Sequence, residues 1–208
     1  MLNVINGHKQ EELIEVLKSQ PEEVRAKVEE VSVDMWEGFT VVINTLFPNA
    51  KIIYDRFHVM DIINDELNQL RKMMNVHTKG LPHLLWKNQE DLNEEQKQSL
   101  ENILTEHPCL RIAYEMQEEI RRIYESSRTV SGAQRRFEKW IRLGGILYRR
   151  SANMMRKHLT GICNYFENHT TNGITEGINT KIKLIKRISY GFTNFENLKL
   201  KLFACFNS

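Results

Sequence analysis

The alternation of apolar and polar residues separates a short mixed segment near the start of the chain from a long helical remainder. Two β-branched runs, Val31–Val33 and Ala50–Tyr54, predict short buried strands. The segment between them, from about Met35 to Phe47, has helical spacing and ends at a Pro-Asn turn. A strand, a helix and a second strand of these lengths predict a right-handed parallel crossover.

Helical periodicity dominates elsewhere. Before the first strand, Gln10–Ser19 and Glu22–Glu30 have the apolar spacing of two short helices, and Leu2–Ile5 resembles the end of another strand. We interpret Thr78–Pro82 as a linker. After the second strand, amphipathic helices are predicted at about 59–75, 93–105, 110–126, 131–143, 151–168, within 171–192, and at 195–206.

The segment Thr171–Phe192 has two distinct faces when it is wound as a helix. One face is apolar and predicts a buried stripe, made of Ile174, Ile178, Ile182 and Ile185. The opposite face carries a single carboxylate followed by basic residues: Glu176, Thr180, Lys183 and Arg187, with Asn179 and Lys186 beside them. Periodicity alone favours a solvated charged face. Only a second carboxylate placed to meet Glu176 would indicate a metal site.

Charge is distributed unevenly although the formal net charge is only +2. Basic residues concentrate between Arg121 and Lys157, a block that could neutralise DNA phosphates. Aromatic residues are interleaved with it and could stack on unpaired bases, namely Tyr124, Phe137, Trp140 and Tyr148. Because Phe137 and Trp140 fall on an apolar helix face, core packing is the stronger interpretation for them. The arginines therefore carry the phosphate hypothesis.

Composition excludes several classes of protein. The three cysteines are too few and too widely spaced for a disulfide framework or a zinc knuckle, which fits a reducing cytoplasm. The first residues contain no apolar run of signal-peptide length, and no stretch approaches 18 apolar residues. We expect a cytoplasmic protein with no membrane partner.

Carboxylates follow both predicted strands. Asp34 and Asp55 stand at carboxyl ends of strands, where open α/β sheets place their ligands. Asp34 together with Glu176 could hold a divalent metal, although an aspartate after a strand is equally often a helix N-cap. For Asp55 the favoured interpretation is a cap of the following helix or a pair with Arg56, and His58 is interpreted as structural.

Three motifs resemble a known family. They are VSVDMWEGF (Val31–Phe39), FPNAKIIYDRFHV (Phe47–Val59) and NGITEGINTKIKLIKRISYGFTNFENLKLKLF (Asn172–Phe203). With these motifs the chain resembles the C-terminal part of a DDE transposase of the ISL-three group. The resemblance implies an α/β, predominantly helical fold with a truncated ribonuclease-H-like core of two or three short strands and a large all-α insertion.

The resemblance also implies a division of the chain and a partial active site. Residues 1–78 would form a partial ribonuclease-H-like core, 79–168 the helical insertion, and 169–208 the C-terminal helices that complete the core. Asp34 matches the second aspartate of the catalytic triad and Glu176 matches the glutamate, both as metal ligands. No segment of this chain corresponds to the first aspartate, so we expect a fragment that is inactive alone.

As a function, the resemblance implies DNA cutting and strand transfer with Mg²⁺ or Mn²⁺, which the chain alone would bind weakly or not at all. The partners would be transposon-end DNA and either full-length transposase or a missing N-terminal part. The residues expected to contact DNA are Lys183, Lys186, Arg187, Arg135, Arg136, Arg149 and Arg150. The alternative is a non-catalytic helical protein that binds DNA or the transposase and regulates it; a product without selected activity is a third interpretation.

Overall fold

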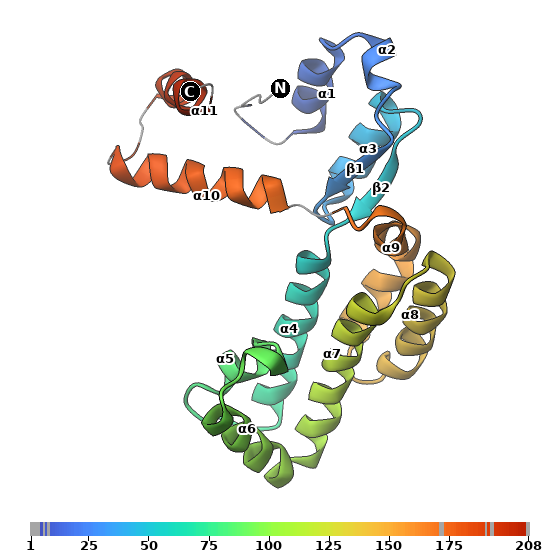
Figure 1. Ribbon diagram of the computed structural model, residues 1–208, viewed down its shortest axis with the longest axis vertical. Helices are drawn as coiled ribbons and strands as arrows, with labels where there is room; N and C mark the ends of the chain where they lie inside the picture. The colour runs from blue at the N-terminus through green and yellow to red at the C-terminus, as the bar shows by residue number, and fades with distance from the viewer. Residues whose placement is uncertain are drawn as a thin grey trace. The chain divides into compact units, whose positions relative to one another are not determined.

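The computed structural model describes residues 5, 7, 9–170, 173–189, 191 and 194–206, without the side chains of 174–176. The chain forms two compact units, and each is described by itself (Figure 1). The first unit contains residues 1–52 and 170–208, and the second contains residues 53–169. The strand expected at Leu2–Ile5 falls mostly on residues outside the described part.

The first unit contains the predicted strand, helix and strand. After α1 (Gln10–Lys18) and α2 (Glu22–Arg25) come β1 (Glu30–Val33), α3 (Glu37–Leu46) and β2 (Lys51–Tyr54), whose end passes into the second unit. The two strands pair as a small parallel sheet. The α/β, predominantly helical class is therefore confirmed for the described residues, whereas a ribonuclease-H-like core and the three-part division of the chain stay predictions.

Packing of α3 explains why this segment folds locally. Val42, Ile43 and Leu46 recur on one face of α3 and are buried. The predicted helix over Glu22–Glu30 is too long, because α2 ends at Arg25. The carbonyl of Glu29 accepts a hydrogen bond of 2.8 Å from the Lys51 N–H, which commits this residue to the sheet rather than to a helix.

The second unit is a helical bundle. It contains α4 (Arg56–Met73), α5 (Leu81–Trp86), the short 3₁₀ helix η1 (Gln89–Asp91), α6 (Glu94–Glu106), α7 (Pro108–Ser126), α8 (Val130–Gly144) and α9 (Arg149–Asn168). Figure 1 shows α8 alongside α9, and α4 packs against both α7 and α9. Apolar residues at helical spacing fill the core, including Ile63, Leu67, Leu110, Ile120, Ile123, Phe137, Met155 and Ile162.

Helix α5 corrects the linker expected at Thr78–Pro82. Gly80 has φ +81°, a left-handed conformation that favours glycine, and the following Pro82 lies in the first turn, where its missing N–H costs nothing. Leu81 and Leu85 are fully buried, so tertiary packing stabilises a helix too short to be recognised by its periodicity.

The buried carboxylate of Glu66 on α4 joins that helix to the start of α9. Its Oε1 accepts a hydrogen bond from the Arg150 N–H (2.9 Å), and its Oε2 accepts from the Ser151 N–H (2.8 Å) and hydroxyl (2.5 Å). These backbone donors belong to the first turn of α9, which has no carbonyl partners of its own. A carboxylate 84 residues away in sequence thus supplies the N-terminal cap of α9.

Helices α10 (Gly173–Ile188) and α11 (Phe195–Phe206) belong to the first unit. Ile185 is buried, and Ile178 and Ile182 are half-buried, which confirms the apolar stripe for these three members. Leu202 of α11 is also buried. Lys181 links the two helices, because its ammonium donates to the Cys205 carbonyl (2.6 Å) and lies 4.4 Å from the Phe206 ring centroid. No helix among the described residues is long and apolar enough to cross a membrane.

Candidate functional site

Asp34 lies exposed in the turn between β1 and α3. Helix α3 begins at Glu37, and its N-cap residue is Trp36, whose side chain makes no capping hydrogen bond. The interpretation of Asp34 as a helix N-cap is therefore wrong, and its carboxylate is open to solvent and to a ligand. A carboxylate oxygen is the ligand type that Mg²⁺ prefers, so the chemistry of Asp34 fits the expected ion.

Glu176, the other expected metal ligand, falls within α10, but its side chain is outside the described part, as is that of Ile174. The relation between Asp34 and Glu176 therefore stays a prediction. Among the side chains that the structure describes, no three histidine, cysteine or acidic groups converge on a position for a metal ion.

Asp55 has the capping role that was predicted for it. It is the N-cap of α4, only 1% exposed, and its Oδ1 accepts a hydrogen bond of 3.4 Å from the Phe57 N–H. Its Oδ2 is buried without a hydrogen-bond partner. Six residues further along the chain, burial raises the pKa of Asp61, an effect that nearby His58 opposes.

The basic face of α10 is solvent-exposed where it is described. Lys183, Lys186 and Arg187 are exposed, while Ile185 on the opposite face is buried. The two last-turn cations, Lys186 and Arg187, also interact favourably with the negative end of the helix dipole. These three side chains are available for phosphate contacts.

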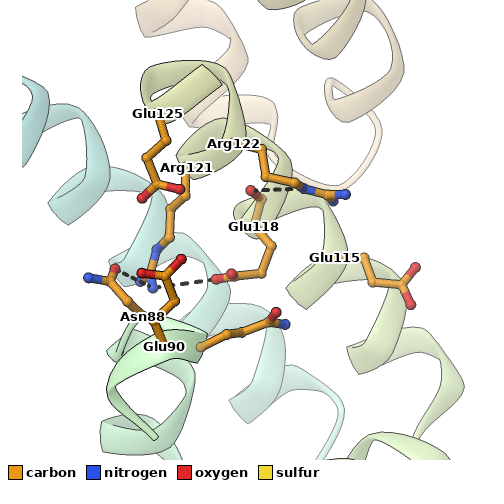
Figure 2. A pocket seen from close by; sticks show the side chains of 8 residues that line it. Asn88, Glu90, Glu115, Glu118, Arg121, Arg122 and Glu125 are labelled. Carbon is orange, nitrogen blue, oxygen red and sulfur yellow. Dashed lines mark hydrogen bonds and ion pairs between the residues drawn. The ribbon is translucent and has the colours of Figure 1, made fainter. Parts of the chain in front are cut away.

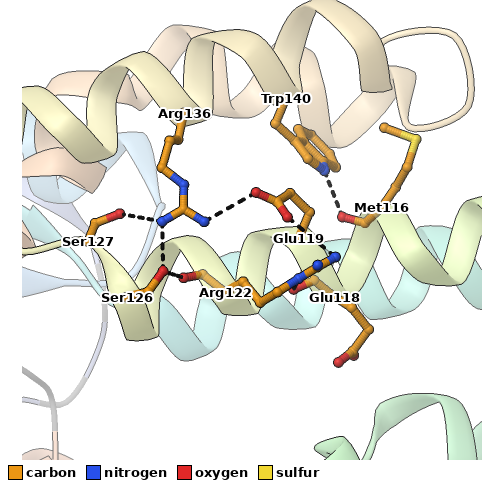
Figure 3. Close-up of polar contacts among 8 residues, drawn as sticks. All are labelled: Met116, Glu118, Glu119, Arg122, Ser126, Ser127, Arg136 and Trp140. Carbon is orange, nitrogen blue, oxygen red and sulfur yellow. Dashed lines mark hydrogen bonds and ion pairs between the residues drawn. The ribbon is translucent and has the colours of Figure 1, made fainter.

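The arginines expected to contact DNA in the second unit differ in their surroundings. Arg149 and Arg150 are exposed in the first turn of α9, and Arg135 is exposed on α8. Arg136 is half-buried between helices: its guanidinium donates to the hydroxyls of Ser126 (2.7 Å) and Ser127 (3.1 Å) and pairs with Glu119 at 3.2 Å (Figure 3). Arg136 therefore already joins α7 to α8.

Arg121, also in the basic block, is buried and binds the chain itself. Its guanidinium donates to the carbonyls of Trp86 (2.6 Å) and Lys87 (2.6 Å) and to the Asn88 side chain (3.0 Å). The hypothesis that the whole block faces phosphates is too broad, because this arginine is used to hold the segment after α5 against α7.

The interleaved aromatic residues form core contacts. Phe137, Trp140, Tyr124 and Tyr148 are all buried, which confirms the core interpretation for the first two and extends it to the tyrosines. The Trp140 Nε1–H donates to the Met116 carbonyl at 2.7 Å, and the Tyr148 hydroxyl donates to the Ala113 carbonyl at 2.6 Å. None of the four is placed on the surface to stack on a base.

Sequence reasoning missed an acidic cavity beside Arg121. About 460 Å³ in volume, it is lined by Glu90, Glu115, Glu118 and Glu125 together with Arg121 and Arg122 (Figure 2). Burial raises the pKa of Glu118, and this outweighs the opposing effect of Arg121, whose guanidinium lies 3.4 Å from Glu118 Oε1. With four carboxylates this cavity is unsuited to phosphate. The sequence signals this cavity only through an acid-rich stretch between Glu90 and Glu119, which contains three of its four glutamates.

Comparison with known proteins agrees with the family resemblance of the three sequence motifs. The profile of the DDE transposases of the ISL3 group, described as Transposase, matches residues 1–202. The transposase for insertion sequence element IS1001 of Bordetella parapertussis is 28% identical over 195 residues, or 86% of this chain and 48% of that protein. The transposase for element IS1557 of Mycobacterium tuberculosis is 33% identical over 118 residues, or 55% of this chain and 26% of that protein.

The chain spans about half the length of the first of these relatives and about a quarter of the second. No solved structure matches it.

Proposed function

The chain belongs to the ISL3 group of DDE transposases, and from this membership we propose that it is part of an enzyme that cuts and joins DNA during transposition of an insertion sequence. The match over residues 1–202 is the observation that carries the proposal. The relatives named above are transposases of insertion sequences, which supports transposon-end DNA as the substrate.

Asp34 and Glu176 are the proposed ligands of Mg²⁺ or Mn²⁺. Support comes from the exposure of Asp34, which caps no helix, and from the oxygen chemistry of both side chains. A bound divalent ion would activate an attacking oxygen and stabilise the leaving oxygen of the phosphodiester. The contribution of Asp34 and Glu176 is to hold that charge close to the scissile phosphate.

The basic face of α10 is the proposed contact with the DNA backbone. Lys183, Lys186 and Arg187 are exposed on the helix that carries Glu176, so phosphate binding there would bring DNA to the metal ligand. In the second unit, Arg135, Arg149 and Arg150 are the further candidates. Arg136 is a weaker one, because phosphate would have to compete with Glu119 and two serines.

Salt dependence of DNA binding tests this contact. Each phosphate neutralised by a cation contributes about 0.9 to the slope of log K against log salt concentration. Replacing Lys183, Lys186 and Arg187 together by alanine should reduce that slope by up to about 2.7. The matched control replaces Lys72, Lys79 and Lys97, three exposed lysines of the second unit, and should change it little. Equal reductions in both variants would contradict a specific role for α10.

A nicking assay with Mn²⁺ distinguishes the enzyme from the non-catalytic alternative. We expect no cleavage by the 208 residues alone, since by the resemblance Asp34 and Glu176 are two of three required carboxylates. Both proteins would bind DNA without cleaving it when tested alone, so the result that would favour a regulatory protein is reduced cleavage by full-length transposase when this chain is added. Cleavage that disappears in Asp34→Asn would contradict the expectation of inactivity and support Asp34 as a ligand.

A further inference from the structure

Helices α7 and α8 of the second unit form a groove on its surface that the proposed cutting chemistry does not use. The groove has a volume of about 400 Å³, and its apolar lining residues are Ile112 and Met116 of α7 and Trp140 and Leu143 of α8. Trp140 is buried, whereas Ile112 and Leu143 are 53% and 56% exposed. Large apolar side chains that gather at the surface instead of packing in the core indicate an interaction site.

Contacts between the two helices hold the groove in shape. Figure 3 shows two of them: the Trp140 Nε1–H donates to the Met116 carbonyl at 2.7 Å, and Arg136 pairs with Glu119 at 3.2 Å. A Cβ atom added to Gly144 would lie 2.9 Å from Met116 Cε, so this glycine lets Met116 lie against α8. The groove therefore exists before any partner binds, which lowers the entropic cost of binding.

The charged residues of the lining are separated by sign. The acids both lie on α7 and the bases both lie on α8: Glu115 and Glu119, and Arg136 and Lys139. Glu119 and Arg136 neutralise each other across the groove, as described above. Glu115 and Lys139 are exposed, and neither forms an ion pair with a described residue. Arg111 lies near Glu115, but its guanidinium is held by Glu101 at 2.6 Å. The α7 edge therefore carries a negative charge and the α8 edge a positive one.

The hydrogen bond from α8 to the Met116 carbonyl sets the register of these two antiparallel helices. One turn further along the groove, Ile112 of α7 lies level with Leu143 of α8. Beside the hydrogen bond, Glu115 lies level with Lys139. Apolar residues and opposite charges thus occupy matching levels on the two sides of the groove.

A second copy of the chain matches this arrangement. A two-fold axis that runs along the groove, in the plane between two copies, places α8 of each copy over α7 of the other at the same level. Glu115 of each copy then faces Lys139 of the other, and Ile112 faces Leu143. A small apolar ligand would cover the apolar side chains but leave both charges unmatched, whereas a second copy matches the charges and the apolar residues twice.

We propose that α7 and α8 form a two-fold interface with a second copy of this chain, in which these charged and apolar residues pair. The 15 residues of α8 span roughly 22 Å and the two packed helices roughly 20 Å, so two copies together would bury roughly 900 Å². Because stable specific interfaces bury at least roughly 1,000 Å², the dimer should be weak, with a dissociation constant of roughly 10–100 µM. The inference involves no DNA contact and does not depend on the proposed function.

Sedimentation equilibrium of the 208-residue chain without DNA, from about 1 to 300 µM, measures this association. Leu143→Glu places a charge at the apolar centre of the interface and should weaken association about tenfold or more. The matched control, Met73→Glu, puts the same charge at a 78% exposed apolar residue at the end of α4 and should leave association unchanged. A wild-type chain that stays monomeric throughout, or a dimer that persists in Leu143→Glu, would overturn the inference and leave the groove to another occupant.

Charge reversal tests the two-fold pairing at exposed residues, where substitutions leave the fold intact. Glu115→Lys and Lys139→Glu each create two pairs of like charges in the dimer, so each variant alone should associate about tenfold more weakly. In an equimolar mixture of the two variants every pair joins opposite charges again, so association should return to the wild-type level. Lys72→Glu, at an exposed lysine of α4, should change association little. A mixture that associates no better than its components, or equal weakening by Lys72→Glu, would overturn the inference.

Discussion

Replacing Glu66 by alanine should destabilise the second unit more than any surface substitution. The change removes the acceptor of two backbone N–H groups in the first turn of α9 and of the Ser151 hydroxyl, at 2.5 to 2.9 Å. The Ser151 N–H is buried, so water cannot easily replace the carboxylate, whereas the Arg150 N–H is only partly buried.

The magnitude follows from these contacts. A hydrogen bond to a charged group is worth roughly 1.5–3 kcal/mol, and a buried donor left unpaired costs about 1–3 kcal/mol. Counting the Ser151 N–H in full, the Arg150 N–H in part and the freely rotating hydroxyl least, we expect Glu66→Ala to lower the free energy of unfolding by about 3 kcal/mol. Glu66→Gln keeps one acceptor oxygen but points an NH₂ group at a donor, so its cost should be intermediate.

Urea denaturation followed by far-UV circular dichroism measures this change, and tryptophan fluorescence checks that the two probes report the same transition. The matched control is Glu106→Gln, an exposed glutamate at the end of α6, which should alter the free energy of unfolding by no more than about 0.5 kcal/mol. A double-mutant cycle with Ser151→Ala should show coupling between the two residues. If Glu66→Ala cost no more than Glu106→Gln, the cap assigned to α9 would be wrong.

Three further predictions follow from buried groups. Burial raises the pKa of Glu118 above its usual 4.5, so the folded state keeps this proton to higher pH than the unfolded chain, and the stability that protonation contributes is lost as pH rises through the folded pKa. Glu118→Gln should therefore flatten the dependence of the unfolding free energy on pH in that window, as measured by urea titrations. Burial raises the pKa of Cys163 to about 12, whereas Cys109 is exposed, so iodoacetamide at pH 8 should modify Cys109 first and Cys163 only after unfolding. Mass spectrometry detects both products, and rapid labelling of Cys163 in the folded chain would contradict its burial. Tyr148→Phe removes the buried hydrogen bond to the Ala113 carbonyl and should lower the free energy of unfolding by about 1 kcal/mol, which thermal denaturation would show as a lower melting temperature. An unchanged melting temperature would contradict that bond.

Local patterns in the sequence predicted most of the secondary structure, because burial repeats with the period of each element. The long amphipathic helices and the apolar face of α10 were predicted from a period of 3.6 residues, and the two strands around Asp34 from short runs of β-branched and other apolar residues. Helix α5 was missed because six residues are too few to show a period. The motif containing Glu176 was recognised by its resemblance to a family, not from its spacing.

Which charged side chains remain free for function was decided by the tertiary structure alone. In the sequence, Glu66, Arg121 and Arg136 look like ordinary charged helix residues, yet each is held by groups on another helix, such as the Ser151 N–H, the Trp86 carbonyl and Glu119. Lys183 and Arg149 have the same residue chemistry but remain exposed. Helical periodicity determines which face of a helix is apolar, whereas the partner of a charged group is set by contacts across tens of residues that no local pattern contains.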